Sequence, residues 1–581
     1  MIEAMTDFPF PWTDLAARDS APTEGLLQAA QALWGQALRF DPSDPLWPDR
    51  DRVVVSQPGL MDRLRDMTGD VDAGLDMSRA PPGQAIGTAV GLALAEARLS
   101  ARFGRSLVDH RTWVLCDGAD LETGVALEAA ALAGMLGLAR LCVIAGVAQS
   151  DTSGADRFAA SGWSVRRVSC EVPGPDGQMD REAVRNAVVA AIAATVRARR
   201  PMLIICTQAA GIGSGRPTTD DAAVPAWAAV AARGRTARRG WQRRAFRHRL
   251  RAEFTRWQNG AAPPLWEVDW ARAWRTNVGS GTPASPLAAA GHALDQIAQL
   301  RPELTCLTLA PPDHDPQYTA LAIACGTRDH GMAALLNGLG LHGALLPFGV
   351  ISAVSIDRLR PALRLAAVMR QQVVHLLCDE GAALQGADMI WLPVEQLASL
   401  RAMPNVFLFR PCDPVETRAA FTSALARTDG PSVIVLDGRP DTRRPDTEAA
   451  PHGGTLPLGI GPEQGAYVRS GPNVARDVTL IASGHEVAVA EALRRRLAGH
   501  GIEACVVSLP CWKQFARTDA TYREAVLGTA PRIGLERASG FGWERWLGTE
   551  GLFLGAEAIA NGCDDALLAR VRAHLAAITT A

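Results

Sequence analysis

The chain has 581 residues, of which 48% are hydrophobic and 21% charged, and its formal net charge is −2. This length holds about three domains of ordinary size, and the composition excludes a disordered chain. The near-zero net charge argues against nucleic acid or a membrane surface as the main partner.

The first predicted domain covers residues 1–228, where strand and helix patterns alternate. Segments 111–118 (RTWVLCDG) and 140–146 (RLCVIAG) are predicted strands, and 122–139 between them has the apolar period of a helix. A strand, a helix and a second strand in this order predict a βαβ unit, and therefore a parallel sheet. Segment 201–208 (PMLIICTQ) adds another buried strand.

Residues 229–290 are rich in arginine, with Trp and Phe interleaved at helical spacing. One interpretation is an interaction module centred on 233–256 that binds anionic partners, and salt-dependent binding to anionic polymers would support it. The other is a solvated amphipathic helix in an interdomain linker, docked by its aromatic residues. The balanced charge of the remaining chain favours the linker.

Two further α/β domains are predicted at 291–455 and 456–581. In the first of them the strands are 371–379, 405–413 and 431–438, and in the second they are 478–484, 502–510 and 531–536. Helical segments separate these strands. Open α/β sheets bind ligands outside the carboxyl ends of their strands, so we expect functional side chains there.

The sequence also predicts a cytoplasmic protein. Its first residues lack a basic start followed by an apolar core, so no secretory signal is expected, and no apolar run is long enough to predict a transmembrane helix. The 11 cysteines form no CxxC pair, which is typical of reduced, buried thiols. Lys513 is the single lysine and follows no glycine-rich loop, which argues against Schiff-base and P-loop chemistry.

Several motifs, in order along almost the whole chain, resemble the transketolase family of thiamine diphosphate enzymes. They are 41–56 (DPSDPLWPDRDRVVVS), 81–103 (PPGQAIGTAVGLALAEARLSARF), 116–138 (CDGADLETGVALEAAALAGMLGL), 325–349 (CGTRDHGMAALLNGLGLHGALLPFG), 393–417 (PVEQLASLRAMPNVFLFRPCDPVET), 483–515 and 539–548. The resemblance implies three open, mostly parallel α/β domains of transketolase type: a diphosphate-binding-type domain, a pyrimidine-binding-type domain and a transketolase C-terminal domain.

The resemblance further implies an activity and an assembly. Transketolases move two-carbon ketol units between sugar phosphates, using thiamine diphosphate with Mg²⁺ or Ca²⁺. They are homodimers whose active sites lie between subunits, so this chain is expected to form a homodimer or to pair with another chain of the family. No membrane or nucleic-acid partner is expected, and the remodelled cleft would take a small molecule.

The same resemblance assigns the diphosphate and metal positions. Gly83 and Gln84 lie at the glycine-rich helix start, and Asp117 and Gly118 in the metal motif. The family's second metal ligand, an Asn, corresponds to Ala148, which has no side-chain oxygen, and Gln149 could replace it only with a register shift. An isolated Asp at a strand end is also a common helix cap. The metal site is therefore expected to be incomplete.

The pyrimidine ring positions are altered as well. In the family's acid motif this chain has Asp329 in place of Glu, followed by His330; these two are the candidate catalytic residues. Asp329 alternatively caps the helix that follows. The ring-stacking aromatic positions correspond to Ser352, Ser355 and Arg358. The loss of three stacking contacts predicts weak cofactor binding.

The family's pocket histidines are absent from four corresponding loops. These are 19–25, 56–61, 216–223 and 384–392. Arg439 lies only near the position of the family's phosphate-binding Arg. The remaining His342 and His375 fall on helix and strand patterns, where satisfied structural histidines are expected.

We therefore expect a transketolase-like protein with lost or strongly altered thiamine diphosphate chemistry: a pseudoenzyme, a ligand-binding protein or a partner subunit. If the chemistry is lost, no cofactor is expected. The alternative is an active transketolase-type transferase with non-standard substrates, which would use thiamine diphosphate and Mg²⁺. Asp117, Gly118 and Asp329 favour the alternative, and Ala148 with the lost aromatic residues opposes it.

Overall fold

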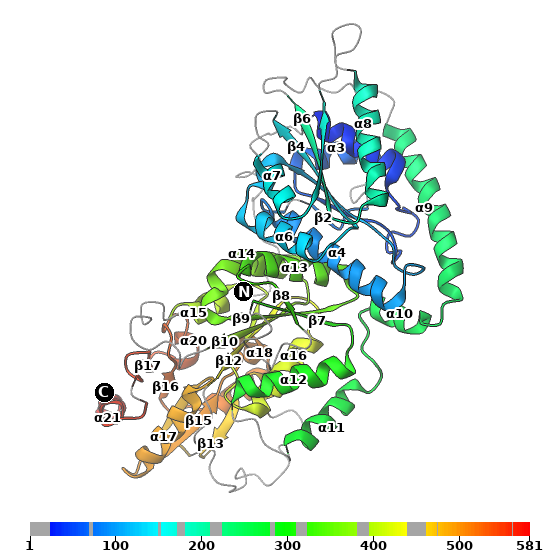
Figure 1. Ribbon diagram of the computed structural model, residues 1–581. Helices are drawn as coiled ribbons and strands as arrows, with labels where there is room; N and C mark the ends of the chain where they lie inside the picture. The colour runs from blue at the N-terminus through cyan, green and yellow to red at the C-terminus, as the bar shows by residue number, and fades with distance from the viewer. Residues whose placement is uncertain are drawn as a thin grey trace. The chain divides into compact units, whose positions relative to one another are not determined.

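The computed structural model describes residues 24–68, 74–78, 80–148, 153–170, 180–208, 223–278, 285–309, 322–379, 394–438, 461–472, 475–560 and 562–580. The chain divides into two compact units. Unit 1 comprises residues 1–261 and 330–345, and unit 2 comprises residues 262–329 and 346–581. Unit 1 holds the first sheet, and unit 2 holds the second and third sheets (Figure 1).

The first sheet has six strands in the order β2-β1-β3-β4-β6-β5, and every pair is parallel. Its strands are β1 (Arg52–Val55), β2 (Met77–Ser78), β3 (Thr112–Asp117), β4 (Leu141–Ala148), β5 (Ser164–Ser169) and β6 (Met202–Gln208). The predicted βαβ unit at 111–146 is present, because β3 and β4 are parallel neighbours joined by the short helix α5 and the longer helix α6.

Helices of unit 1 lie on both faces of this sheet, as parallel connections require (Figure 1). The helices of unit 1 are α2 (Glu24–Ala32), the π-helix η2 (Leu33–Ala37), α3 (Pro58–Thr68), α4 (Gln84–Phe103), α5 (Gly118–Leu121), α6 (Gly124–Met135), α7 (Ser153–Ala160), α8 (Arg181–Ala194), η3 (Thr195–Arg197), α9 (Ala223–Phe246), α10 (Arg251–Gln258) and α13 (Asp329–His342), the last of which belongs to unit 1 from His330 on.

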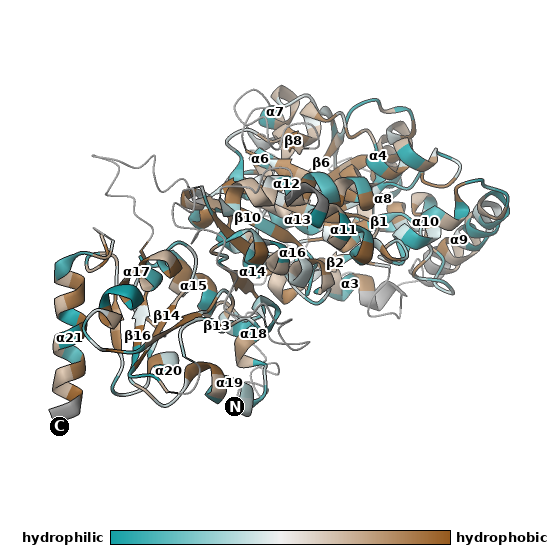
Figure 2. Ribbon diagram, turned by 90° about the horizontal axis from the view of Figure 1, so that it is seen from below, coloured by the Kyte–Doolittle hydropathy of each residue, from teal (hydrophilic) through white to brown (hydrophobic). Residues whose placement is uncertain are grey.

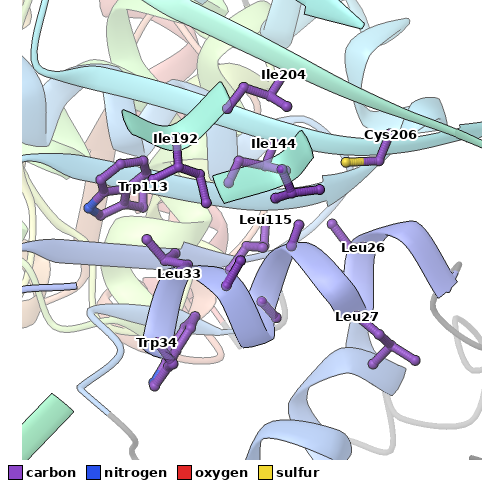
Figure 3. Packing of buried hydrophobic residues seen from close by; sticks show 14 of the residues in the cluster. Leu26, Leu27, Leu33, Trp34, Trp113, Leu115, Ile144, Ile192, Ile204 and Cys206 are labelled. Atoms are coloured by element: carbon purple, nitrogen blue, oxygen red, sulfur yellow. The ribbon is translucent and has the colours of Figure 1, made fainter. Parts of the chain in front are cut away.

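A buried apolar cluster holds α2 and η2 against the first sheet (Figure 3). Leu26 and Leu33 of α2 and η2 face Leu115 of β3, Ile144 of β4 and Ile204 of β6. All five side chains are at most 1% exposed. Burial of this size stabilises the layer by roughly 1.5–3 kcal/mol per large side chain. This packing fixes the strands whose carboxyl ends carry the site residues.

Unit 2 contains two more sheets. The second sheet, ordered β11-β12-β10-β9-β7-β8, is entirely parallel. The third, ordered β13-β15-β14-β16-β17, has one antiparallel pair, β13 with β15. Their strands are β7 (Leu304–Thr308), β8 (Ala322–Ala324), β9 (Leu346–Ser352), β10 (Val374–Asp379), β11 (Phe407–Phe409), β12 (Ser432–Asp437), β13 (Tyr467–Ser470), β14 (Val478–Ala482), β15 (Ala504–Ser508), β16 (Arg532–Leu535) and β17 (Leu552–Leu554).

Helices separate these strands along the chain, which confirms the predicted α/β class with three mostly parallel sheets. They are α11 (Trp266–Val278), α12 (Pro286–Leu300), η4 (Ala353–Ser355), α14 (Ile356–Val368), α15 (Gln396–Ala402), α16 (Pro414–Ala426), η6 (Pro462–Gln464), α17 (Glu486–Ala498), α18 (Trp512–Ala516), α19 (Ala520–Leu527), α20 (Glu544–Leu547) and α21 (Asp565–Thr580). Among the helices of the described ranges, none has the length and apolar character that a membrane crossing needs.

Candidate functional site

Polar side chains gather in unit 1 where strands β1 and β3 end. Ser56 follows β1, Asp117 is the last residue of β3, and β3 lies between β1 and β4. Because all three strands are parallel, their carboxyl ends meet at one edge of the sheet. This edge is where open α/β sheets hold their ligands.

Asp117 caps the short helix α5. Its backbone is extended, with φ −96° and ψ 174°, and its Oδ1 accepts a hydrogen bond from the backbone N–H of Asp120 at 3.2 Å. The capping role expected of an isolated Asp is therefore real. One carboxylate oxygen of Asp117 serves the cap, and Gly118 is the first residue of the helix.

Asp120 connects three segments of this edge, and sequence reasoning did not single it out. It is 4% exposed, and its Oδ2 accepts from Ser56 Oγ at 2.5 Å while its Oδ1 accepts from the backbone N–H of Gly83 at 2.7 Å. Burial raises the pKa of this carboxyl. The signal that could have found it is its position three residues after Asp117 at the start of a helix.

Gly83 sits where a side chain would not fit. Its φ is +73°, and a Cβ atom there would lie 1.9 Å from Thr123 Oγ1. Glycine is therefore required both for the left-handed backbone and for the close approach. This geometry lets the loop before α4 reach Asp120.

Gln84 and His330 meet next to Gly83. The Nε2 atoms of the two side chains are in hydrogen-bond contact, and Gln84 Oε1 is buried without a partner in the described part of the chain. Burial lowers the pKa of His330, so its imidazole is neutral near pH 7. The structure thus brings Gly83, Gln84 and His330 together, with Asp117 linked to them through Asp120.

Asp329 belongs to unit 2, where it forms an ion pair. Its Oδ2 accepts from Arg358 Nε at 2.6 Å, and Arg358 Nη2 donates to Ser355 Oγ at 3.0 Å. The Asp329 side chain is 5% exposed, and its Oδ1 is buried with no partner within the described ranges. Ser352 ends strand β9 in the same unit.

The described residues contain no group of three or more His, Cys, Asp or Glu side chains that could hold a metal ion. Ala148 is the last residue of β4. Gln149, Arg439, the segment after Gln208 and the loop 384–392 lie outside the described residues, as does most of 19–25. The capping hydrogen bond of Asp117 uses Oδ1. Within the described part, this leaves its second carboxylate oxygen at the edge of the first sheet.

His342 and His375 are buried as expected, but both ring nitrogens of His375 and Nδ1 of His342 have no hydrogen-bond partner among the described residues, so the expectation of satisfied histidines is wrong for these atoms. His375 lies in β10 and His342 in α13, both buried. Burial lowers the pKa of His375 to about 4. His342 Nε2 lies 3.2 Å from His110 Nε2, and the two rings are stacked. All 11 cysteines are free thiols, in agreement with the sequence.

Comparison with known families gives three matches in the order of the chain. "Transketolase, thiamine diphosphate binding domain" matches residues 68–260, "Transketolase, pyrimidine binding domain" matches 308–440, and "Transketolase-like TK C-terminal domain" matches 465–559. The three matches follow one another along the chain in the same order as the motifs found in the sequence.

Relatives and solved structures agree with these matches. The chain is 34% identical to the transketolase of Sinorhizobium medicae (strain WSM419), over 91% of this chain and 85% of that one. It is also 34% identical to that of Cereibacter sphaeroides, over 91% and 90%. The structure of transketolase from Leishmania mexicana superposes with a TM-score of 0.80 at 23% identity, covering 95% of this chain and 96% of that one, which shows a shared fold.

Proposed function

Because this chain belongs to the transketolase family, we propose that it is a transketolase-like protein whose thiamine diphosphate chemistry is strongly altered. In this proposal the protein still binds the cofactor at the strand-end edge of unit 1 but does not carry out ordinary ketol transfer. Asp329, His330, Asp117, Gly118, Gly83 and Gln84 are its site residues.

The observation that carries this proposal is the ion pair between Asp329 and Arg358. Arg358 Nε donates a charge-assisted hydrogen bond to Asp329 Oδ2 at 2.6 Å. An acid that acts on a cofactor ring must direct a carboxyl oxygen at that ring. Arg358 therefore occupies one of the two oxygens through which Asp329 could act.

The residues that remain fit the diphosphate end of the cofactor. Asp117 offers a carboxylate, and Mg²⁺ is commonly held by one or two carboxylates together with phosphate oxygens and waters. Gln84 Oε1 of the same unit is a buried acceptor without a partner among the described residues, which costs about 1–3 kcal/mol until a donor reaches it; phosphate oxygens only accept, so this donor would come from another part of the cofactor. Thiamine diphosphate, when bound, supplies the reactive carbon for group transfer; the protein's part is to hold it.

A second candidate is an active transketolase-type transferase that moves two-carbon ketol units. The intact arrangement of Asp117, Asp120 and Gly83 favours it, together with 34% identity to a protein named transketolase over 91% of this chain. The two candidates differ in one property, which is whether the chain turns over a ketol donor at an ordinary rate.

The test combines binding with turnover. Thiamine diphosphate with Mg²⁺ is titrated into the purified protein by calorimetry, and ketol transfer from a ketose phosphate to an aldose phosphate is then assayed for the wild type, Arg358→Gln and Arg364→Gln. Arg364 lies on the same helix and is exposed, so it is the matched control. We expect a wild-type rate far below the usual 1–10³ s⁻¹ and at least about a 10-fold gain in Arg358→Gln alone, on the scale of general acid catalysis.

Ordinary wild-type turnover would overturn the proposal and favour the active transferase. If the folded protein gives no heat of binding at millimolar cofactor, the chain has lost cofactor binding altogether. The same samples, sized by light scattering, test the proposed homodimer against a requirement for another chain of the family.

A further inference from the structure

Four arginines form an exposed ridge along α9. Arg235, Arg239 and Arg243 lie on the helix at intervals of four residues, and Arg247 continues the series in the turn after it. Side chains four residues apart share one helix face. All four are exposed, and within the described part of the chain none of their side chains has a hydrogen bond or an ion pair. We call them the arginine ridge.

Other residues of α9 already attach the helix to unit 1. Arg238 pairs with Asp41 at 2.6 Å and with Asp44 at 3.1 Å, and Trp241 Nε1 donates to the carbonyl of Leu107 at 2.8 Å. The ridge adds nothing to this attachment. Because α9 contains no acidic residue over its 24 positions, like charges four residues apart repel one another and weaken the helix. Packing therefore gives no reason for the ridge.

A hollow with an aromatic wall lies beside the ridge. It has a volume of about 360 Å³ and is lined by Arg239, Gln242, Arg243, Phe246 and Arg247. Phe246 is 71% exposed, and the guanidinium of Arg251 lies over its ring, 5.0 Å from the centroid. Single exposed apolar side chains are ordinary on protein surfaces, so Phe246 matters here because of its place in the hollow beside the ridge arginines. Hydrophilic segments recur along α9 and α10 (Figure 2).

We propose that the arginine ridge binds a single-stranded polynucleotide. Proteins that bind single strands without sequence preference combine a line of cationic side chains, which follows the phosphates, with aromatic rings on which bases stack. The ridge supplies the line, about 18 Å long at 1.5 Å per residue, and Phe246 supplies the ring. Arginine forks bind phosphate oxygens in pairs, and Gln242 can donate to or accept from a base edge.

The same observations disfavour the other anionic partners. A membrane-bound amphipathic helix inserts an apolar face, but the apolar residues Val230 and Ala245 of α9 are buried within unit 1. An acidic protein segment would pair with the arginines and leave the aromatic hollow without a function. The net charge of −2 had argued against a nucleic-acid partner, but it averages over the whole chain, whereas binding depends on the local field.

The experiment measures the anisotropy of fluorescein-labelled oligothymidylate and oligouridylate of about 16 nucleotides against full-length protein in a salt series. Four neutralised phosphates on a single strand predict that log K falls with log salt at a slope of about −2.8. The double variant Arg239→Gln with Arg243→Gln should halve the steepness of this dependence, to a slope of about −1.4. Phe246→Ala should weaken binding about 5- to 150-fold and leave the slope unchanged, because stacking carries no charge.

The control variant is Arg570→Gln with Arg572→Gln, which removes two exposed arginines from α21 and should not affect binding. Circular dichroism establishes that each variant is folded. The proposal is overturned by no oligonucleotide binding at about 50 mM salt, or by equal loss in the control variant. It is also overturned if heparin or phosphatidylserine vesicles bind as tightly as the oligonucleotides and Phe246→Ala has no effect on oligonucleotide binding.

Discussion

At the residue scale, Gly83 determines how α4 begins. Its φ is positive and the Thr123 side chain lies too close for a Cβ atom, so only glycine fits at this position. In this conformation the Gly83 N–H reaches Asp120, which in turn holds Ser56. One glycine thus sets the distance between the start of α4 and the strand ends of the site.

We predict that Gly83→Ala destabilises unit 1 by about 1–3 kcal/mol, since alanine at positive φ is strained and its methyl group overlaps Thr123. Gly124→Ala is the matched control, because a Cβ atom at Gly124 meets nothing within 4 Å. Urea unfolding of the two variants measures the difference. Equal midpoints would mean that the backbone at Gly83 relaxes without cost.

At the element scale, Arg233 links α9 to the π-helix η2 by hydrogen bonds. Arg233 donates to the carbonyls of Trp34 and Gly35, both at 2.7 Å, and to that of Leu38. The last carbonyls of a helix have no partner inside the helix. Arg233 satisfies them, which explains why a half-buried cation is tolerated there.

Replacing Arg233 with alanine should lower the free energy of unfolding by about 1–3 kcal/mol, because buried carbonyls lose charge-assisted donors. Arg235→Ala, two residues along the same helix but exposed, should have no cost and can gain a few tenths of a kcal/mol from relieved repulsion. Chemical denaturation of both variants gives the comparison. A loss in Arg235→Ala as large as in Arg233→Ala would refute the capping role.

At the scale of the whole molecule, unit 2 joins its second and third sheets through a buried charge network. Arg401 binds both oxygens of Glu536 at 2.6 and 2.7 Å, and Arg410 contacts Glu536 and Glu486. Glu536 directly follows β16, and Ser483, which donates to it at 2.8 Å, directly follows β14. At the carboxyl ends of β14 and β16, the third sheet is therefore bound by arginines that precede and follow β11.

Glu536 gives this network a defined pH dependence. Burial by itself raises the pKa of Glu536, but the charges of Arg401 and Arg410 and the hydrogen bonds from Arg401 and Ser483 outweigh it and lower the pKa to about 2. A lowered folded-state pKa stabilises the protein above the unfolded pKa of about 4.3. That stability is lost as the pH falls through the folded value.

Glu536→Gln should therefore cost about 3–5 kcal/mol near neutral pH, because it leaves buried arginines without their charge partner. The difference from the wild type should shrink between about pH 4.3 and 2. Exposed Glu544, replaced by glutamine, is the control and should change stability by less than about 0.5 kcal/mol. Denaturation across this pH range measures both, and a difference that is constant with pH would contradict the assignment.

Strand periodicity was enough to predict the centre of each sheet. The apolar runs at 111–118, 140–146 and 201–208 became β3, β4 and β6, because buried parallel strands need continuous apolar sequence. The position of Asp117 at a strand end followed from the same pattern. The sequence did not predict β13, whose half-exposed residues carry no apolar signal and which pairs antiparallel to β15.

The sequence by itself determined the α/β class, the order of the motifs and the residue types at the candidate site, because these depend on local periodicity and on residue identity. Tertiary structure alone decided that Asp120 ties the site together, that Arg358 pairs with Asp329 and that the side chains of the arginine ridge have no partner among the described residues. The physical reason is that hydrogen bonds and ion pairs depend on distances between residues far apart in the chain, and only the packed structure sets those distances.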